Sequence, residues 1–279
     1  MFKSIAVRVA QGTQYIKDPR KANPAGFRGK PVISAAACEE GCTACVASCP
    51  TGAITLTAMT EMPSPPTPLP QAGEGSEVSR YATSTLDTVK IDLGRCVMCG
   101  DCEPACPSAK LSFINDFRLA STERTGLVVS ESRPHIDPIK VSSALRRRFG
   151  RSLKLRVVSA GGCNGCELEI NALSNVNFDF GRYGIDIVAS PRHADGLVLS
   201  GVLNQNMAQS LQLCWDGIPD PKFVIAVGAC AISGSPFEGA AGIERSFLER
   251  FTPSLYIPGC PPHPLTFICG VLDLLGIPS

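Results

Sequence analysis

Aromatic and histidine side chains are scarce in this chain of 279 residues, which has one Trp, four Tyr and three His. A surface on which aromatic rings stack against bases is therefore not expected. The formal net charge is only +1 at pH 7. This near-neutral balance lacks the basic signature of nucleic-acid binding, and we expect no nucleic-acid partner.

Long apolar runs are also missing. No stretch of about 18 uncharged apolar residues occurs, so the sequence predicts no transmembrane helix. Arg8 interrupts the apolar residues near the amino end, and we expect no signal peptide. These features favour a cytoplasmic, reducing compartment, where clustered cysteines mean metal binding or catalysis more often than disulfides. The chain has no glycine-rich nucleotide loop and no Ser-His-Asp constellation, so we expect no complete active site of its own.

Cysteine is abundant, with fourteen residues, and eight of them form two similar runs that each end in Cys-Pro. The runs are Cys38-Glu-Glu-Gly-Cys42-Thr-Ala-Cys45-Val-Ala-Ser-Cys49-Pro50 and Cys96-Val-Met-Cys99-Gly-Asp-Cys102-Glu-Pro-Ala-Cys106-Pro107. The second has the C-x2-C-x2-C-x3-C-P spacing of bacterial ferredoxins, in which the fourth cysteine binds the other cluster. The first has one extra residue between Cys38 and Cys42. Gly41 is expected to absorb it in a bulge; otherwise that cluster would be loosely held or lost.

The ferredoxin spacing predicts two [4Fe–4S] clusters that exchange their fourth ligands. The ligands expected for the first cluster are Cys38, Cys42, Cys45 and Cys106. The ligands expected for the second cluster are Cys96, Cys99, Cys102 and Cys49. A structural zinc site is a poorer interpretation, because the Cys-Pro ends fit the exchange.

The length and the composition predict two domains. We place an α+β, ferredoxin-like two-cluster domain at residues 1–135, with residues 1–35 as an extended lead-in and residues 36–114 as an internal repeat. A proline- and glycine-rich insertion at about residues 60–80 is expected to be a flexible excursion without a function.

Residues 136–279 are predicted to form an α/β domain with a doubly wound, flavodoxin-like parallel sheet. Asp137-Pro138 is predicted to begin a short helix that ends near Gly150. Its arginines belong to a basic cluster, which is either a solvated face or a docking site for an acidic partner or lipid headgroups. Strands are then expected at 155–160, 185–189, 196–200, 222–227 and 254–257, and helices from about 167, at 207–214 and at 264–275.

Four cysteines of this second domain, Cys163, Cys166, Cys230 and Cys260, each follow the end of a predicted strand. The carboxyl ends of parallel strands line the ligand crevice of such sheets, so three loops can bring four thiolates to one point. A third [4Fe–4S] cluster is the expected occupant. A zinc site, or a redox pair formed by the first two cysteines, remains an alternative. The remaining two, Cys214 and Cys269, lie on apolar helical stretches and are expected to pack in the core.

Several stretches together resemble a known family. Four of them are residues 162–169 (Gly-Cys-Asn-Gly-Cys-Glu-Leu-Glu), 189–195 (Ala-Ser-Pro-Arg-His-Ala-Asp), 228–231 (Gly-Ala-Cys-Ala) and 258–262 (Pro-Gly-Cys-Pro-Pro). They resemble the small, cluster-bearing subunit of membrane-bound [NiFe] hydrogenases and formate hydrogenlyase, which is a relative of the 20 kDa subunit of complex I. Residues 1–115, including Gly-Phe-Arg-Gly-Lys-Pro at 26–31, resemble the two-cluster ferredoxin subunit of the same complexes. The chain thus resembles a fusion of two neighbouring subunits.

The resemblance implies a non-catalytic electron-transfer subunit that relays electrons through three [4Fe–4S] clusters to or from the active site of a hydrogenase-like large subunit. It also implies membrane-integral partner subunits, a further redox subunit, and peripheral attachment to the cytoplasmic side of a membrane. The complex I branch has adjacent cysteines where this chain has Asn164 and Gly165 between its two. That spacing favours the hydrogenase branch over a complex I-like quinone oxidoreductase or a nickel-free relative.

Other residues in these motifs suggest lesser roles. Arg192 and His193 are expected near the third cluster, although His193 is not expected to be a ligand. Glu167 and Glu169 either border a proton path or solvate a helix start, where acidic side chains favour the helix dipole. His263 either donates a hydrogen bond near the last ligand cysteine or lies on a surface loop.

Overall fold

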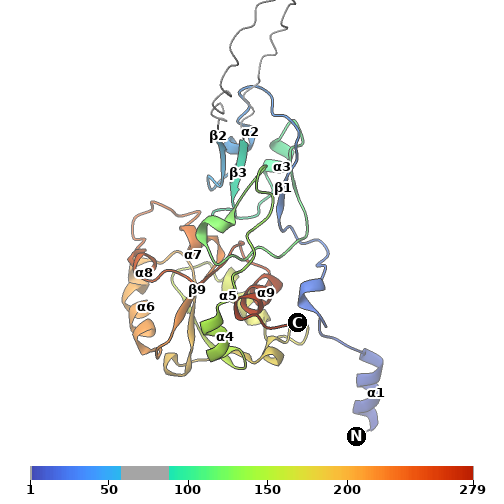
Figure 1. Ribbon diagram of the computed structural model, residues 1–279, viewed down its shortest axis with the longest axis vertical. Helices are drawn as coiled ribbons and strands as arrows, with labels where there is room; N and C mark the ends of the chain where they lie inside the picture. The colour runs from blue at the N-terminus through green and yellow to red at the C-terminus, as the bar shows by residue number, and fades with distance from the viewer. Residues whose placement is uncertain (1, 58–87, 279) are drawn as a thin grey trace, which may run out of the picture.

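The structure is a computed structural model that describes residues 2–57 and 88–278. The insertion predicted at residues 60–80 lies outside these residues. Figure 1 shows a small module that carries both cysteine runs at one end of the long axis, and an α/β domain below it.

Five short strands of the described residues form two antiparallel sheets in the small module. Their bounds are β1 (Pro31–Ile33), β2 (Ile54–Thr57), β3 (Thr88–Asp92), β4 (Leu111–Phe113) and β5 (Val128–Ser130). β1 pairs with β4, and the second sheet has the order β2-β3-β5. A four-residue helix lies within each cysteine run, α2 (Ala44–Ala47) in the first and α3 (Cys102–Ala105) in the second. The predicted repeat of cluster loop and short strand is therefore present.

The first residues of the lead-in form a helix, α1 (Phe2–Gln11), where the sequence predicted an extended segment. That prediction was wrong because every glycine and proline of residues 1–35 lies after residue 11. Gly12 ends the helix with a φ of +64°, and its N–H donates to the Arg8 carbonyl (3.1 Å). The short 3-10 helix η1 (Pro19–Lys21) follows.

Five parallel strands form the sheet of the α/β domain. Their bounds are β6 (Leu153–Ser159), β7 (Ile185–Ile187), β8 (Gly196–Ser200), β9 (Phe223–Val227) and β10 (Leu255–Ile257). The spatial order is β10-β9-β8-β6-β7, and every neighbouring pair is parallel. Chain order therefore reverses between β6 and β8, which is the kind of switch point where doubly wound sheets bind ligands. The predicted parallel α/β architecture is confirmed.

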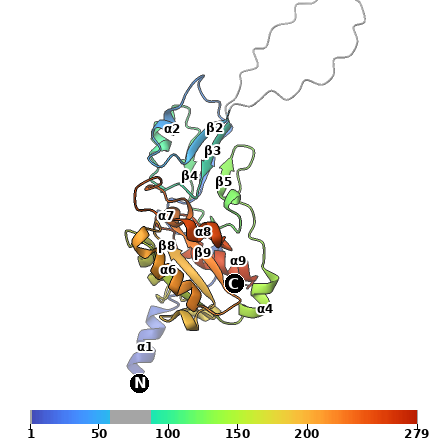
Figure 2. The same cartoon turned by 90° about the vertical axis from the view of Figure 1, so that its left-hand side faces the viewer.

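Helices cover both faces of this sheet, α5 and α9 on one and α6 and α8 on the other (Figures 1 and 2). The helices of the domain are α4 (Ser143–Phe149), α5 (Gly165–Ala172), α6 (Gln205–Gly217), α7 (Gly228–Ser233), α8 (Ser246–Arg250) and α9 (Pro264–Leu275). Further 3-10 helices are η2 (Arg124–Leu127), η3 (Phe180–Tyr183) and η4 (Pro191–His193). α9 is almost entirely apolar, and the lead-in covers the side that the sheet leaves open: Leu265 and Cys269 pack with Ile16 and Phe27. The charged residue of α9, Asp273, pairs with Arg20 of the lead-in (2.6 Å).

The predicted start of the helix α4 was wrong. Ser142 is the N-cap, and its hydroxyl accepts a hydrogen bond from the Leu145 N–H (3.3 Å). Asp137 instead forms an ion pair with Arg133. The predicted end at Gly150 is confirmed.

The small module and the α/β domain share a hydrophobic core. Ala231, Ile232 and Tyr256 of the α/β domain pack in one cluster with Leu93 and Leu127 of the small module. The division at residue 135 stays a prediction. Among the described residues, no helix has the length and apolar character needed to cross a bilayer.

Candidate functional site

Three loops at the carboxyl edge of the parallel sheet carry four cysteines, called here the third group. Cys163 and Cys166 follow β6, Cys230 lies in α7 just after β9, and Cys260 follows β10. Burial raises the pKa of Cys166 to about 12, and Glu167 and the other three thiols of the group contribute to this rise. The structure thus brings together the four cysteines that the sequence grouped; their role as ligands stays a prediction.

Backbone in the left-handed region lets these loops approach one another. Gly228 has a φ of +86°, and a Cβ at this position would lie 2.6 Å from the Cys166 sulfur. Only glycine fits there, because any side chain would collide with the thiol. The Ala229 N–H donates to the Gly259 carbonyl (3.0 Å), which ties the loop of Cys230 to that of Cys260. The loops are therefore built to hold four sulfurs around one space.

The two ferredoxin-type runs form two further groups, and the last cysteine of each lies with the other run. The pKa of Cys45 is raised by burial and then by the nearby Cys106 thiol of the other run. The pKa of Cys96 is raised to about 12, by burial and by neighbours that include Cys49 of the first run. We call them the first group (Cys38, Cys42, Cys45 and Cys106) and the second group (Cys96, Cys99, Cys102 and Cys49).

Backbone N–H donors surround these sulfurs. The Ala53 N–H lies 3.2 Å from the Cys49 Sγ, and the Lys110 N–H lies 3.3 Å from the Cys106 Sγ. Hydrogen bonds of this kind stabilise thiolates and tune the iron–sulfur clusters that thiolates hold. The donors therefore fit a cluster better than inert thiols.

A small cavity of about 20 Å³ borders the second group. Its wall includes all four cysteines of that group together with apolar side chains such as Ile54, Ile91 and Phe113. The four thiols match the ligand count of a four-iron cluster, in which each iron takes one thiolate, while the cavity itself has room for about one water molecule. Within the described ranges, no three His, Cys, Asp or Glu side chains are arranged around a single ion.

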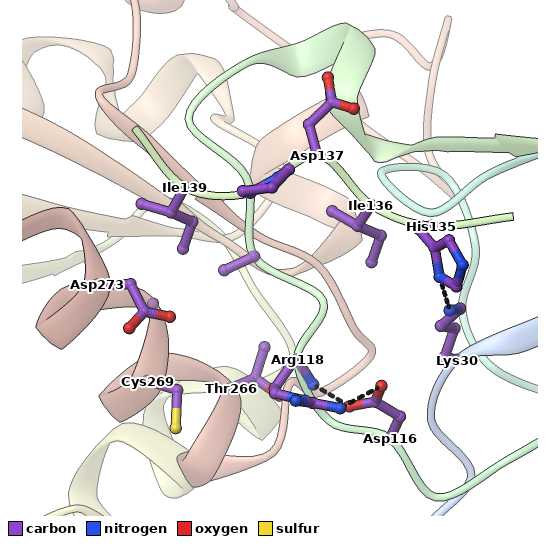
Figure 3. Close-up of a pocket in the computed structure, with 13 residues that line it drawn as sticks. Lys30, Asp116, Arg118, His135, Ile136, Asp137, Ile139, Thr266, Cys269 and Asp273 are labelled. Carbon is purple, nitrogen blue, oxygen red and sulfur yellow. Dashed lines mark hydrogen bonds and ion pairs between the residues drawn. The ribbon is translucent and has the colours of Figure 1, made fainter. Parts of the chain in front are cut away.

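A different cavity, of about 210 Å³, lies between the small module and α9. Figure 3 shows two pairs among its side chains: Arg118 Nε lies 2.9 Å from Asp116 Oδ1, and Lys30 Nζ lies 3.2 Å from His135 Nδ1. Cys269 forms part of its wall and is only 2% exposed, and none of the twelve grouped cysteines lines this cavity. The expectation that Cys269 packs in the core is confirmed. Cys214 is half-buried and packs against the core beneath α6.

The two glutamates after Cys166 differ in their surroundings. Glu167 Oε1 accepts a hydrogen bond from the Ser200 hydroxyl (2.6 Å). Burial acts to raise the pKa of Glu167, but hydrogen bonds from Ser159 and Ser200 outweigh it and the pKa is lowered. The pKa of Glu169 is instead raised, by burial. Glu167 is thus an anchored anion under the third group, not merely a solvated helix start.

His263 is not a surface-loop residue. Its Nδ1 accepts the Leu265 N–H (3.1 Å), which caps α9, and its ring packs among Phe27, Phe117 and Phe178 with centroid distances of 4.9, 6.3 and 5.9 Å. Burial in this aromatic cage lowers the pKa of the imidazole. The residue joins the lead-in to the α/β domain.

Arg192 and His193 do not lie near the third group, so that expectation was wrong. They form η4, which precedes β8, and Pro191 of this helix packs against Gly217 at the end of α6. In a parallel sheet the segment before a strand lies at the edge opposite the one that carries the cysteine loops. Both side chains are exposed there.

Sequence reasoning missed three cations that contact the cysteine loops. Arg245 Nη1 donates to the Cys230 carbonyl (3.1 Å). Arg28 Nη1 donates to the carbonyls of Met98 (3.2 Å) and Cys99 in the second run. Lys110 Nζ donates to the Ala36 carbonyl (2.5 Å), just before the first run. Aligning the two halves of the repeat would have singled out Lys110, because it occupies the position of Ala53. The spacing of the cysteines gives no indication that Arg28 contacts the second run.

Comparison with known proteins bears on these groups. The family model described as "NADH ubiquinone oxidoreductase, 20 Kd subunit" matches residues 163–274, and the 4Fe-4S dicluster domain model matches residues 37–110. A probable membrane-bound hydrogenase subunit, mbhJ of Pyrococcus furiosus, is 40% identical over 125 residues, which are 44% of this chain and 74% of that protein. The chain belongs to the 20 kDa subunit family. It joins that family's domain to a dicluster domain.

Other members of the 20 kDa subunit family include both hydrogen- and quinone-linked proteins. Formate hydrogenlyase subunit 7 of Escherichia coli K12 is 38% identical over 137 residues, which are 49% of this chain and 54% of that protein. An NADH-quinone oxidoreductase subunit of Bacteroides thetaiotaomicron is 39% identical over 128 residues, 45% of this chain and 64% of that protein. The chain thus spans about half the length of the formate hydrogenlyase subunit. The recognised family resemblance is confirmed, and identity alone does not separate its branches.

Proposed function

We propose that this chain is the iron–sulfur electron-transfer subunit of a membrane-bound complex like [NiFe] hydrogenase or formate hydrogenlyase. It relays electrons through three [4Fe–4S] clusters to or from the active site of a partner large subunit. The observation that carries the proposal is the presence of three groups of four cysteines in one chain. When bound, the clusters supply one-electron redox chemistry.

The chain's own residues hold and insulate these centres. Thiolates of the first, second and third groups serve as ligands, and backbone N–H groups donate to sulfurs such as those of Cys49 and Cys106. Each iron that binds takes a thiolate, so thiols whose pKa is raised must release protons as a cluster assembles. Apolar side chains around the second group limit the access of water.

The contact between the two modules supports a linear order of centres. Arg95 lies next to Cys96, and it pairs with Glu238 (2.5 Å) and accepts a hydrogen bond at its carbonyl from the Ser235 hydroxyl (3.1 Å). Gly94 packs so closely on Ile232 that a Cβ would lie 2.7 Å away. Ile232 belongs to α7, the helix that carries Cys230. We therefore place the second group between the first group and the third.

The third group also borders the exposed surface. Cys163 and Cys260 are exposed, and Leu168 on α5 is 62% exposed. Thiols and an apolar side chain at the open edge of the sheet suit a protein partner that buries them. We therefore place the large subunit against this edge, where an electron has the shortest path to the third group.

Two basic elements support peripheral attachment to a membrane. α1 has no acidic residue, carries Lys3 and Arg8, and exposes Ile5 (55%) and Val9 (77%). It stands away from the α/β domain at the end of the molecule opposite the small module (Figures 1 and 2). The exposed arginines 146–148 of α4 lie in the same half. Short basic, amphipathic helices bind anionic lipid surfaces, as the cytoplasmic leaflet offers.

Vesicle cosedimentation tests this attachment with the full chain. We expect binding to vesicles that contain phosphatidylglycerol and little binding to phosphatidylcholine alone, with weakening as salt rises. The double variant Ile5→Ser, Val9→Ser is expected to lose most of the binding. Leu213→Ser, which changes an equally exposed residue (64%) on α6, serves as the control. Equal binding of both variants, or to both lipids, would contradict the proposal.

Anaerobic purification from native membranes tests the electron-transfer function. We expect nickel to copurify, with about twelve irons per copy of this chain from its three four-iron clusters. Iron without nickel would favour the second candidate, a component of a complex I-like quinone oxidoreductase or a nickel-free relative, which the similarity to the NADH-quinone oxidoreductase protein keeps in view. Zinc in place of iron would contradict electron transfer altogether.

A further inference from the structure

The two halves of the small module differ at one equivalent position. Ala53 and Lys110 are each the fourth residue after the cysteine of a Cys-Pro pair, and each follows a residue with positive φ (Gly52, +57°; Ala109, +46°). Their N–H groups make the same contact to the preceding sulfur, at 3.2 and 3.3 Å. Both residues are buried, with 2% and 3% of their surface exposed. Where one half has a methyl group, the other has a buried ammonium group.

The ammonium group of Lys110 lies against the first group. Its Nζ donates to the carbonyl of Ala36 (2.5 Å), two residues before Cys38, and pairs with Glu131 Oε1 at 3.0 Å. The backbone N–H of Lys110 lies 3.3 Å from the Sγ of Cys106, a member of the first group. The ammonium group and the Glu131 carboxylate therefore lie beside the first group, and their opposite charges act on a cluster in opposite directions.

The second group has a weaker counterpart. Two described cations lie at its loop: the guanidinium of Arg28 donates to the carbonyls of Met98 and Cys99, and Arg95, next to Cys96, is already paired with two carboxylates, Asp92 and Glu238. Arg28 is exposed, so water and salt screen its charge. Lys110 is buried, where the effective dielectric is lower and the same charge acts more strongly. The two groups therefore have similar ligands but different electrostatic surroundings.

We propose that Lys110 is a positioning residue that holds the lengthened Cys38–Cys42 loop through Ala36 and raises the reduction potential of the first cluster above that of the second. The inference rests on the proposed electron-transfer function. Reduction adds one electron and one negative charge to a cluster, so a nearby cation favours the reduced form and a nearby anion disfavours it. The electron then resides mainly on the outer cluster of the small module.

Redox titration of the anaerobically purified full chain, followed by electron paramagnetic resonance, tests the inference. Lys110→Met is expected to lower the reduced-to-oxidised ratio of one cluster about tenfold at a given potential, a shift of about 59 mV for one electron. Glu131→Gln is expected to shift the same cluster in the opposite direction. Lys110→Arg, which keeps the charge, is expected to restore most of the potential. Lys21→Met, which removes an 85% exposed lysine side chain, is the control and is expected to change nothing.

The signal is assigned with Cys42→Ser, which replaces a ligand expected only in the first cluster. The inference is overturned if iron content is intact and Lys110→Met and Glu131→Gln leave every potential unchanged, or if they shift a signal that Cys42→Ser does not alter. If Lys110→Met fails to retain iron, the sign of the Glu131→Gln shift decides. A wild-type preparation that binds zinc and no iron overturns the proposed function itself, and the two failures are thereby distinguished.

Discussion

The two cysteine runs of the small module share a ligand pattern but not their surroundings. The first lies toward the outer end, with its extra residue in a turn in which Gly41 has a φ of +70° and the Cys42 N–H donates to the Glu39 carbonyl (3.1 Å). The expected accommodation of the extra residue at Gly41 is therefore observed. The second lies between the exposed guanidinium of Arg28 and the helix α7.

The spacing of the cysteines identifies the candidate ligands, but the charged side chains around them set the electrostatic surroundings of each group. The buried cation beside the first group comes from the second half of the repeat, and the cation beside the second group comes from the lead-in. Neither belongs to the run that it contacts. A duplicated motif can thus hold two similar clusters at different potentials, because changes outside the motif leave the ligand spacing intact.

The largest effects are expected from replacing the cysteines that the two runs exchange as fourth ligands. Cys106→Ser is expected to alter the same electron paramagnetic resonance signal as Cys42→Ser, and Cys49→Ser the same signal as Cys96→Ser. Each variant is expected to lose up to about four irons per chain, the content of one cluster. The reverse pairing would mean that each run holds its own cluster and would contradict the exchange.

An effect of intermediate size is expected at two glycines, Gly41 in the first run and Gly100 in the second, which both have a positive φ. In Gly41→Ala nothing lies within 4 Å of the new Cβ, so only the left-handed backbone costs stability, about 1–2 kcal/mol. In Gly100→Ala, at a φ of +87°, the Cβ would lie 2.6 Å from the Arg28 guanidinium carbon. Displacing that side chain removes its hydrogen bonds, which adds about 1–2 kcal/mol. Urea unfolding of both variants measures the difference, and equal losses would contradict the role assigned to Arg28.

The smallest expected effect lies at the contact of the second run with the α/β domain. The ion pair of Arg95 with Glu238 is partly exposed, with 31% and 50% of the side-chain surfaces accessible. Glu238→Gln is therefore expected to lower the free energy of unfolding by less than about 1 kcal/mol, and by less still at high salt. Ile232→Ala, at the apolar part of the same contact, should cost more. A larger loss for Glu238→Gln than for Ile232→Ala would reverse this order.

Much of the fold followed from local pattern. The predicted strand 196–200 and helix 264–275 coincide with β8 and α9, because an unbroken apolar run and a proline at the first helical position are local signals. The start of α4 was misplaced because Asp137-Pro138 has the right cap chemistry but Asp137 has a competing partner in Arg133. α7 was missed because Gly228 begins it. The candidate ligands were all found by spacing alone, and their binding of clusters stays a prediction.

By itself, the sequence determined the twelve candidate ligands, the alternation of strands and helices, and the family, since each depends on residues close together along the chain. Only the tertiary structure decided which charges face which thiols. Lys110 reaches Ala36 across 74 residues, and Arg28 reaches Met98 across 70. Such contacts arise where antiparallel strands and packed modules bring distant segments together, and no periodicity in the sequence records them, because a side chain's partner across a fold depends on the path of the whole chain.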